Sequence, residues 1–307
     1  MASTARLVIG TRGSPLALAQ ARLVEQALAR AVPELAGPGA IATQVIRTSG
    51  DAVQDRPLAE IGGKGLFTKE IEDALLDGRI DIAVHSCKDM PTVLPQGLVL
   101  AASLPRADAR DALICEGAST IEELQPAARL GSASVRRVAQ ALAVRPDLRA
   151  VPLRGSVGTR LRKLEEGQVQ ATFLAMAGLD RLGVADDRRV HPLPVETMLP
   201  AVAQGAIAIE ARQADEGVFM LLSRIDDAAT SRCVAAERAL LAELDGSCRT
   251  PIAGLCIEEG QGLWLRGLAA SPDGSRIARV ELRGAAADAR AMGLEAGRAL
   301  RRSDAFG

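Results

Sequence analysis

Residues 80–89, IDIAVHSCKD, decide the fold, because an apolar run changes here to polar residues within one step of the chain. The first five residues, Ile80 to Val84, have the length and apolar character of a buried strand. All of the next five, His85 to Asp89, have polar or ionisable side chains. In open α/β sheets, ligands bind at the carboxyl ends of the strands. The stretch therefore predicts a buried strand whose end carries functional side chains.

The same pattern occurs at three other places in the chain. The apolar run 7–10 is followed by TRGSP, in which Ser14 and Pro15 are residue types that cap and open a helix, here expected to reach about Arg30. Ser132-Ala133-Ser134 can cap a helix from Val135, and a strand at 150–153 is followed by RGSVG and a helix to about Glu166. Each cluster adds Arg or Lys at a predicted helix start. Together the four clusters predict an anion-binding cleft between two α/β lobes.

The remaining elements complete a mixed α/β protein followed by a small α+β unit. A long helix is expected over 228–244, followed by three strands and a closing helix over 286–301, with a turn at Pro272-Asp273-Gly274. The three strands are expected at 252–258, 263–269 and 277–282. Further strands are expected at 41–47, 112–115, 171–175 and 206–211, the last returning to the first sheet, and further helices at 67–76, 121–124 and 178–182.

Composition excludes several classes of protein. The 37 basic and 38 acidic residues give a net charge of −1, which argues against a nucleic-acid binder. No apolar run of about 18 residues occurs, so no membrane span is expected. The N-terminus shows no secretory signal pattern, and five Cys without a CxxC pair predict free thiols in a reducing compartment, hence a cytoplasmic protein. Only two His are present, so no metal site is expected.

The 33 Arg against 4 Lys have two explanations that composition alone does not separate. One is codon usage in a GC-rich genome. The other is a site that binds carboxylate or phosphate bidentately, for which the planar guanidinium is suited.

A few individual residues are candidates for chemistry. Asp89, at a strand end, can stabilise a developing cation or move a proton, although a Lys88–Asp89 turn pair explains it as well. Cys248 lies in a Gly/Ser turn beside Arg249, which favours the thiolate, but an ordinary free Cys is the plainer interpretation. His85 is expected to be a structural hydrogen-bonding residue. The glycines of 62–65 lack P-loop spacing and predict a flexible lid with Lys64 and Phe67 facing a ligand.

Seven long motifs, in order, resemble the porphobilinogen deaminase family along nearly the whole chain. They are TRGSPLALAQA from Thr11, GGKGLFTKEIEDALL from Gly62, DIAVHSCKDMP from Asp81, LRGSVGTRLRKL from Leu153, LAMAGLDRLG from Leu174, LPAVAQGAIAIE from Leu199 and CRTPIAG from Cys248.

The resemblance implies a transferase that condenses four porphobilinogen molecules into linear hydroxymethylbilane and releases ammonia at each step. It implies a dipyrromethane cofactor on a thioether to Cys248, with porphobilinogen and the growing polypyrrole chain as partners. A monomer is expected because the sequence has no interface-like repeat or heptad. The resemblance also implies two α/β domains similar to periplasmic binding proteins and a small α+β C-terminal domain. Their expected bounds are 1–104 with 203–224 for the first, 105–202 for the second and 225–307 for the third.

The resemblance assigns roles to residues that match the motifs. Asp89 is the catalytic carboxylate. The cofactor is expected to contact Ser86, Lys88, Asp89, Ser132, Ser134, Arg136, Arg137 and Cys248. The substrate is expected to contact Arg12, Ser14, Arg154, Arg160, Arg181 and Gln204. Each pyrrole carries an acetate and a propionate, which suits guanidinium groups.

Four positions depart from the expected pattern, namely Glu60, Ala133, Ser156 and Ala203. Two alternatives stay open at this point. A two-lobed binding protein without catalysis explains the lobes and the cleft but not the Cys248 domain. A nucleotide-binding transferase is weakened by the missing P-loop spacing.

Overall fold

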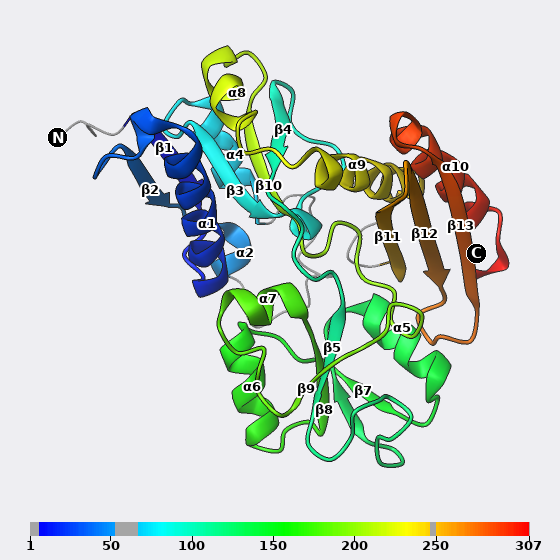
Figure 1. Ribbon diagram of the computed structural model, residues 1–307. Coiled ribbons are helices and arrows are strands. Elements are labelled where there is room, and N and C mark those ends of the chain that lie inside the picture. Colours follow the sequence, from blue (N-terminus) through cyan, green and yellow to red (C-terminus); the bar gives the residue numbers. More distant parts are fainter. Residues whose placement is uncertain (1–5, 53–66, 246–249, 307) are drawn as a thin grey trace. The chain divides into compact units, whose positions relative to one another are not determined.

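The computed structural model describes residues 6–52, 67–245 and 250–306 and contains three β-sheets (Figure 1). The chain divides into two compact units. One is formed by the described residues before Ala107 together with 206–231, and it contains the first sheet. The other contains 107–205 and 232–307, and thus the second and third sheets. The predicted fold class, α/β with a small C-terminal α+β part, is confirmed.

The first sheet has five strands in the order β2-β1-β3-β10-β4. β1 pairs in parallel with β2 and β3, whereas β10 is antiparallel to both β3 and β4. The return of the late strand to this sheet confirms the expectation for 206–211. The strands are β1 (Leu7–Thr11), β2 (Ile41–Val45), β3 (Ile82–Ser86), β4 (Leu98–Ser103) and β10 (Ile207–Arg212).

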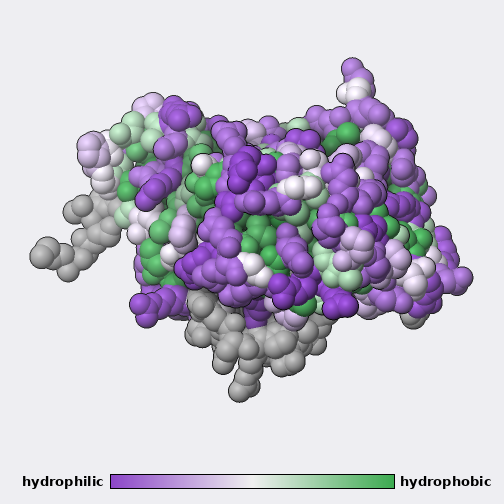
Figure 2. Space-filling model, turned by 90° about the horizontal axis from the view of Figure 1, so that it is seen from below, coloured by the Kyte–Doolittle hydropathy of each residue, from purple (hydrophilic) through white to green (hydrophobic). Residues whose placement is uncertain are grey.

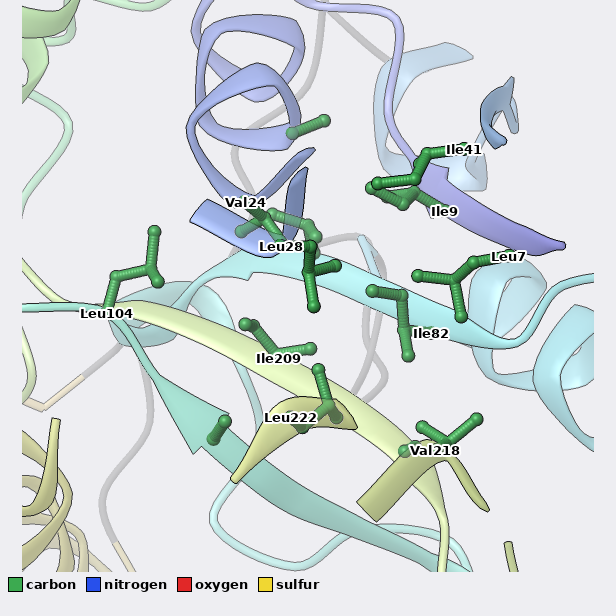
Figure 3. Packing of buried hydrophobic residues seen from close by; sticks show 14 of the residues in the cluster. Leu7, Ile9, Val24, Leu28, Ile41, Ile82, Leu104, Ile209, Val218 and Leu222 are labelled. Atoms are coloured by element: carbon green, nitrogen blue, oxygen red, sulfur yellow. The ribbon is translucent and has the colours of Figure 1, made fainter. Parts of the chain in front are cut away.

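Helix α1 (Pro15–Ala31) covers one face of this sheet, and α4 (Lys69–Leu76) packs on β3 and β10 at the other. Figure 3 shows Val24 and Leu28 of α1 against Ile9, Ile82 and Ile209 of the sheet. The four-residue helix α2 (Ser49–Ala52) and α8 (Glu216–Leu222) complete the unit. α8 adds Val218 and Leu222 to the same core (Figure 3).

The second sheet has the order β7-β6-β8-β5-β9. β6 is parallel to β7 and β8, and β5 is antiparallel to β8 and β9. Its strands are β5 (Asp111–Cys115), β6 (Arg129–Gly131), β7 (Arg149–Val151), β8 (Ala171–Ala175) and β9 (Val190–Pro192). Its helices are α5 (Val135–Val144), α6 (Val157–Glu165) and α7 (Met176–Arg181).

The third sheet is an antiparallel meander against two helices in the second unit. Its strands are β11 (Ile252–Glu259), β12 (Gly262–Ala270) and β13 (Ile277–Ala285), and its helices are α9 (Ala228–Glu243) and α10 (Ala289–Arg301). Figure 1 shows the three strands side by side. The sheet packs on α5 through a shared apolar cluster that includes Ala139, Leu255 and Leu268. The second unit therefore has a continuous core across two sheets.

The helix expected over 121–124 is wrong, since these residues form a turn. The Glu123 carboxylate accepts the N–H groups of Ser119 and Thr120 at 2.7 and 3.3 Å, which holds the preceding chain in a tight local structure. Pro126 follows closely and disfavours helical geometry at Gln125. The short apolar stretch is thus stabilised as a turn.

Polar residues predominate on the molecular face shown in Figure 2, with hydrophobic residues in small groups between them. Among the described residues, no helix has the length and apolar character required to span a bilayer.

Candidate active site

The first unit places a group of the predicted residues around one small cavity. Ser14 caps α1 by accepting the Ala17 N–H at 3.2 Å, and Pro15 is the first residue of the helix, as predicted. The guanidinium of Arg12, at the end of β1, lies 4.3 Å from the ring centre of Phe67. This is a cation–π contact, which orients the arginine.

The end of β3 adds Ser86 and Asp89 to this cavity. Ser86 exchanges hydrogen bonds with the amide of Gln20 at 2.8 and 3.1 Å, and Gln20 is buried in α1. Asp89 closes a short 3-10 helix, Cys87–Asp89, and its side chain is exposed. The cavity has a volume of about 60 Å³ and is lined by Arg12, Ser14, Leu16, Ala17, Gln20, Phe67, Thr68, Val84, His85, Ser86 and Asp89.

His85 occupies the opposite face of β3 from Ser86, in a cluster of buried ionisable side chains. Its Nε2 lies 3.2 Å from Oε2 of Glu210 in β10, close enough for an ion pair although the angle is not that of a hydrogen bond. Glu72 of α4 is also buried there. Burial, together with the nearby Glu210 carboxylate, raises the pKa of Glu72. The expectation that His85 makes a structural contact is in keeping with this pair.

The second unit holds the other predicted residues, beginning with the start of α5. Ser134 caps α5 by accepting the Arg137 N–H, and Ser132 Oγ accepts the Ser134 N–H at 3.1 Å. Arg136 and Arg137 follow directly and are buried. Arg137 donates to the Phe173 carbonyl at 2.9 Å and to Oδ1 of Asp111, while Arg136 donates to the Leu199 carbonyl at 2.7 Å.

Asp111 is the acceptor that holds this cluster together. Nη2 of Arg136 lies 2.8 Å from its Oδ2, and Gln204 Nε2 donates to its Oδ1 at 3.0 Å. Despite complete burial, the two guanidinium groups hold the pKa of Asp111 well below its usual range. Burial, only partly offset by Asp111, lowers the pKa of Arg136. Two arginines share one carboxylate, so the cluster carries a net positive charge.

Arg154, Arg160 and Arg181 lie around α6 and α7 in the same unit. Arg160 Nε donates to the Gly155 carbonyl at 2.9 Å, at the start of α6, and Arg154 is half-buried just before it. Arg181 Nη2 donates to the Gly205 carbonyl at 2.6 Å. Burial lowers the pKa of Arg181 to about 10. Within the described residues no ion pair joins Arg181 to a carboxylate, and the nearby charge of Asp180 offsets only part of the effect of burial on its pKa.

Three of the four departures from the expected pattern lie in the described residues. Ala133 is exposed just before α5 and carries no hydroxyl group. Ser156 replaces the expected Asn as the N-cap of α6 and accepts the Thr159 N–H at 3.2 Å, so the helix start is kept. Ala203 adopts a left-handed conformation with φ 59°, and its N–H is held by the buried Glu237 carboxylate at 2.5 Å. Such a backbone favours glycine.

Cys248, Lys64 and Glu60 lie outside the described residues. Lys88, by contrast, is half-buried one residue before Asp89. Sequence reasoning missed Gln20, Asp111 and Glu210. The two acids could have been found, because a carboxylate in an apolar strand is unusual. Asp111 opens the apolar run DALIC, and Glu210 interrupts the apolar run AIAIEA. Gln20 lies among Ala and Leu in α1, where a buried amide leaves a weaker signal.

Two family models match the chain. The model for "porphobilinogen deaminase, dipyromethane cofactor binding domain" matches residues 7–219, and the model for the porphobilinogen deaminase C-terminal domain matches residues 231–302. The chain belongs to the porphobilinogen deaminase family. It is a transferase that condenses porphobilinogen into hydroxymethylbilane in tetrapyrrole biosynthesis, with a dipyrromethane cofactor. The function expected from the sequence motifs is confirmed.

Curated relatives match over most of their length. A porphobilinogen deaminase of Nitrobacter winogradskyi is 53% identical over 293 residues, which are 95% of this chain and 92% of the relative. That of Paracoccus denitrificans is 55% identical over 293 residues, 95% of this chain and 93% of the relative. A chloroplastic porphobilinogen deaminase of Oryza sativa is 55% identical over 270 residues, 88% of this chain and 75% of the relative.

Solved structures of binding proteins match more distantly. The L-cystine solute receptor of Neisseria gonorrhoeae in its unliganded open conformation is 14% identical with a TM-score of 0.38, covering 71% of this chain and 84% of the receptor.

Proposed function

We propose that Asp89 is the carboxylate that acts on the substrate, and that the Ser, Lys and Arg residues named above bind the carboxylates of substrate and cofactor. The observation that supports this most directly is the cavity of the first unit. It brings the exposed Asp89 together with Arg12, Ser14 and Ser86, three of the predicted binding residues. The carboxylate proposed for catalysis thus borders the same cavity as the guanidinium and hydroxyl groups proposed for binding.

The residues of the second unit fit a polycarboxylate such as dipyrromethane. The charge of Arg181 is offset only in part by Asp180, and its hydrogen bond goes to a neutral carbonyl group. Arg136 and Arg137 share one carboxylate, that of Asp111. An unneutralised charge away from water is costly, so a carboxylate ligand would stabilise each group. Ser132 and Ser134 use their oxygens as acceptors, which leaves each hydroxyl proton able to point to a carboxylate oxygen.

The bound cofactor supplies the pyrrole carbon from which the chain is extended. Asp89 hydrogen-bonds the pyrrole N–H groups and stabilises the positive charge that develops on the substrate as its C–N bond breaks. From the same position, the Asp89 carboxyl group can exchange a proton with the departing amine or with the ring that accepts the new bond. Arg12, fixed over Phe67, holds a substrate carboxylate next to this carboxyl group.

We propose Cys248 as the point of attachment, on the match of its CRTPIAG loop to the family motif. The test is the intact mass of the purified protein. We expect the mass of two pyrrole units in the wild type and in Cys115→Ser, whose thiol is buried and has a pKa raised by burial. We expect loss of that mass in Cys248→Ser. An adduct that persists in Cys248→Ser would overturn the assignment.

We also propose that the protein acts as a cytoplasmic monomer and has no nucleic-acid partner. The net charge of −1 supports this, as do the buried cysteines Cys87, Cys115, Cys233 and Cys256, which form no disulfide within the described part of the chain. Light scattering after size-exclusion chromatography tests the monomer. A mass near twice 32.0 kDa would contradict it.

A further inference from the structure

The buried face of α1 carries one polar side chain, whose amide takes no part in the chemistry proposed above. Gln20 lies on this face with the apolar Ala17, Ala21, Val24 and Leu28, and its relative exposure is 1%. The face packs on the first sheet (Figure 3). An amide buried among apolar groups loses its hydrogen bonds to water, and this costs stability unless the protein supplies partners.

The partner of this amide is the hydroxyl group of Ser86, at the end of β3. Gln20 Nε2 donates to Ser86 Oγ at 2.8 Å, and Oγ in turn donates to Gln20 Oε1 at 3.1 Å. Both polar atoms of the amide are thus directed to one hydroxyl group. The contact joins residues that are 66 positions apart in the chain, so it fixes the Ser86 side chain from a second element of the fold.

The pair lies at the wall of the cavity that contains the proposed catalytic carboxylate. Gln20, Ser86 and Asp89 all line the cavity of about 60 Å³, together with Arg12 and Ser14. Ser86 is half-buried, whereas Gln20 is almost completely buried. A ligand in the cavity therefore has better access to the Ser86 hydroxyl group than to the amide that holds it.

The two hydrogen bonds have different consequences for such a ligand. The bond from Gln20 Nε2 occupies a lone pair of Ser86 Oγ and does not use the hydroxyl proton. The bond to Gln20 Oε1 uses that proton, but it joins two neutral groups. A hydrogen bond to a carboxylate is about twice as strong. Rotation about the Cβ–Oγ bond therefore turns the Ser86 O–H group from Gln20 to an entering carboxylate, while the oxygen atom stays in place.

We propose that Gln20 is a positioning residue, which holds Ser86 so that its hydroxyl group binds a carboxylate of the pyrrole next to Asp89. The neighbouring groups support a carboxylate as the group that is bound. Arg12 is a cation, and Ser14 caps α1 with its oxygen, which leaves its hydroxyl proton for a ligand. The pyrrole is either the substrate or a ring of the cofactor, since both carry such carboxylates. This inference rests on the proposed function of the cavity.

The test replaces Gln20 by methionine in the full-length enzyme. Methionine has a similar length and no amide, so Gln20→Met removes both bonds to Ser86 and suits the apolar face of α1. If the pyrrole is the substrate, we expect KM to rise about three- to tenfold with kcat nearly unchanged. If it is a cofactor ring, a share of the purified chains should lack the mass of two pyrrole units. Melting temperature is measured beside both quantities.

A double variant shows whether Gln20 acts through Ser86. Ser86→Ala should cause the same change as Gln20→Met, and the combined variant should add nothing further. Gln26→Met, at an exposed position of the same helix, is the matched control and should keep the wild-type KM and mass. Additive effects, or wild-type values in Gln20→Met beside an impaired Ser86→Ala, would overturn the inference and leave the proposed role of Ser86 intact. Wild-type values in Ser86→Ala would overturn both.

Gln20→Glu tests the direction of the hydrogen bond, and it replaces Gln20→Met if that variant melts far below the wild type. At about pH 8, well above the usual pKa of a glutamate, the new carboxylate has no proton to donate. It can only accept the Ser86 proton, which keeps that proton from the ligand. We expect Gln20→Glu to lose at least as much as Ser86→Ala. Wild-type KM and mass in folded Gln20→Glu would show that Ser86 accepts a ligand N–H group, and would overturn the inference.

Discussion

Arg137 and Asp111 form a buried ion pair in which Nε and Nη2 of the arginine lie 3.0 and 2.6 Å from the same carboxylate oxygen, Oδ1. Arg136 uses the other oxygen of Asp111, at 2.8 Å. Asp111 opens β5, whereas the two arginines open α5, so the pair joins a strand to the start of a helix. One carboxylate thus fixes two of the proposed cofactor-binding groups, and neither guanidinium is neutralised in full.

Asp111→Asn should destabilise the protein by about 3–5 kcal/mol, because it leaves two buried guanidinium groups without a counter-charge. The measurement is urea unfolding at pH 7, monitored by the fluorescence of Trp264 together with circular dichroism. Asp108→Asn, which removes a partly exposed partner of Arg110, is the control and should cost about 1 kcal/mol or less. Equal losses in the two variants would contradict the role given to Asp111.

The same pair predicts a pH dependence of stability. The pKa of Asp111 is lower in the folded protein than in the unfolded chain, so its contribution is present above the unfolded value of about 3.9 and is lost as pH falls toward the folded value. Between pH 5 and 3 the wild type should therefore lose more stability than Asp111→Asn, as seen in urea midpoints at each pH. Parallel curves for the two proteins would show that Asp111 is not the titrating group.

Asp89→Asn should abolish turnover almost completely and leave the fold intact. The side chain is exposed, so its replacement by an isosteric amide costs little stability, whereas loss of the carboxylate removes proton transfer and charge stabilisation, worth roughly 10²-fold or more. Product formation and melting temperature are measured together. Asp77→Asn, at the exposed end of α4, is the matched control. Near-normal turnover of Asp89→Asn would refute its proposed role.

Much of the fold could be predicted because helix starts and strand ends are marked locally. Ser14 with Pro15, Ser134 and Ser156 each cap the helix that the sequence indicated. Three strands, β4, β6 and β9, were not predicted. β9 contains only Val190–Pro192 and has no periodicity of its own, since it is held by pairing with β5. The predicted 121–124 helix failed because a side-chain carboxylate, Glu123, bonds the backbone locally.

Only those parts of the candidate site that lie in short contiguous motifs could be predicted from the sequence. The clusters at Arg12, Asp89 and Ser132 are contiguous in sequence, so their residue types and helix starts identify them. The partners that set their charge come from elsewhere: Asp111 is 93 residues from Gln204, and His85 pairs with a residue on a strand that returns late in the chain. No spacing in one sequence encodes such contacts, which depend on strand order.

Gly293→Ala should destabilise the C-terminal part, because α9 and α10 are packed backbone to backbone. A Cβ at Gly293 would meet the Ala236 carbonyl oxygen at 2.1 Å and the Ala239 Cβ at 2.7 Å, so the helices would have to separate. We expect a loss of about 1–3 kcal/mol in urea unfolding. Gly217→Ala in α8, where the nearest atom is at 3.7 Å, is the control and should be neutral or slightly stabilising. A neutral Gly293→Ala would contradict the close packing.

Arg181→Met should raise stability while it lowers activity. In the folded protein the pKa of Arg181 is about 10, which means that burial disfavours its charged form, and the Gly205 carbonyl does not repay that cost in full. Methionine has a similar length and apolar character, so it removes the penalty and keeps the packing. A residue that lowers stability is expected where binding requires it. Arg181 fits this case if its guanidinium binds a carboxylate of the substrate.

Melting temperature and KM are the two quantities to measure for this variant. We expect a higher melting temperature and a rise in KM of about tenfold or more for Arg181→Met, with the lost charge-assisted bond worth roughly 1.5–3 kcal/mol. Arg181→Lys keeps the charge but not the planar pair of donors, so its KM should lie between that of the wild type and that of Arg181→Met. Arg188→Met, at an exposed position nearby, should change neither quantity. A lower melting temperature with unchanged KM in Arg181→Met would show that Arg181 supports the fold and not the ligand.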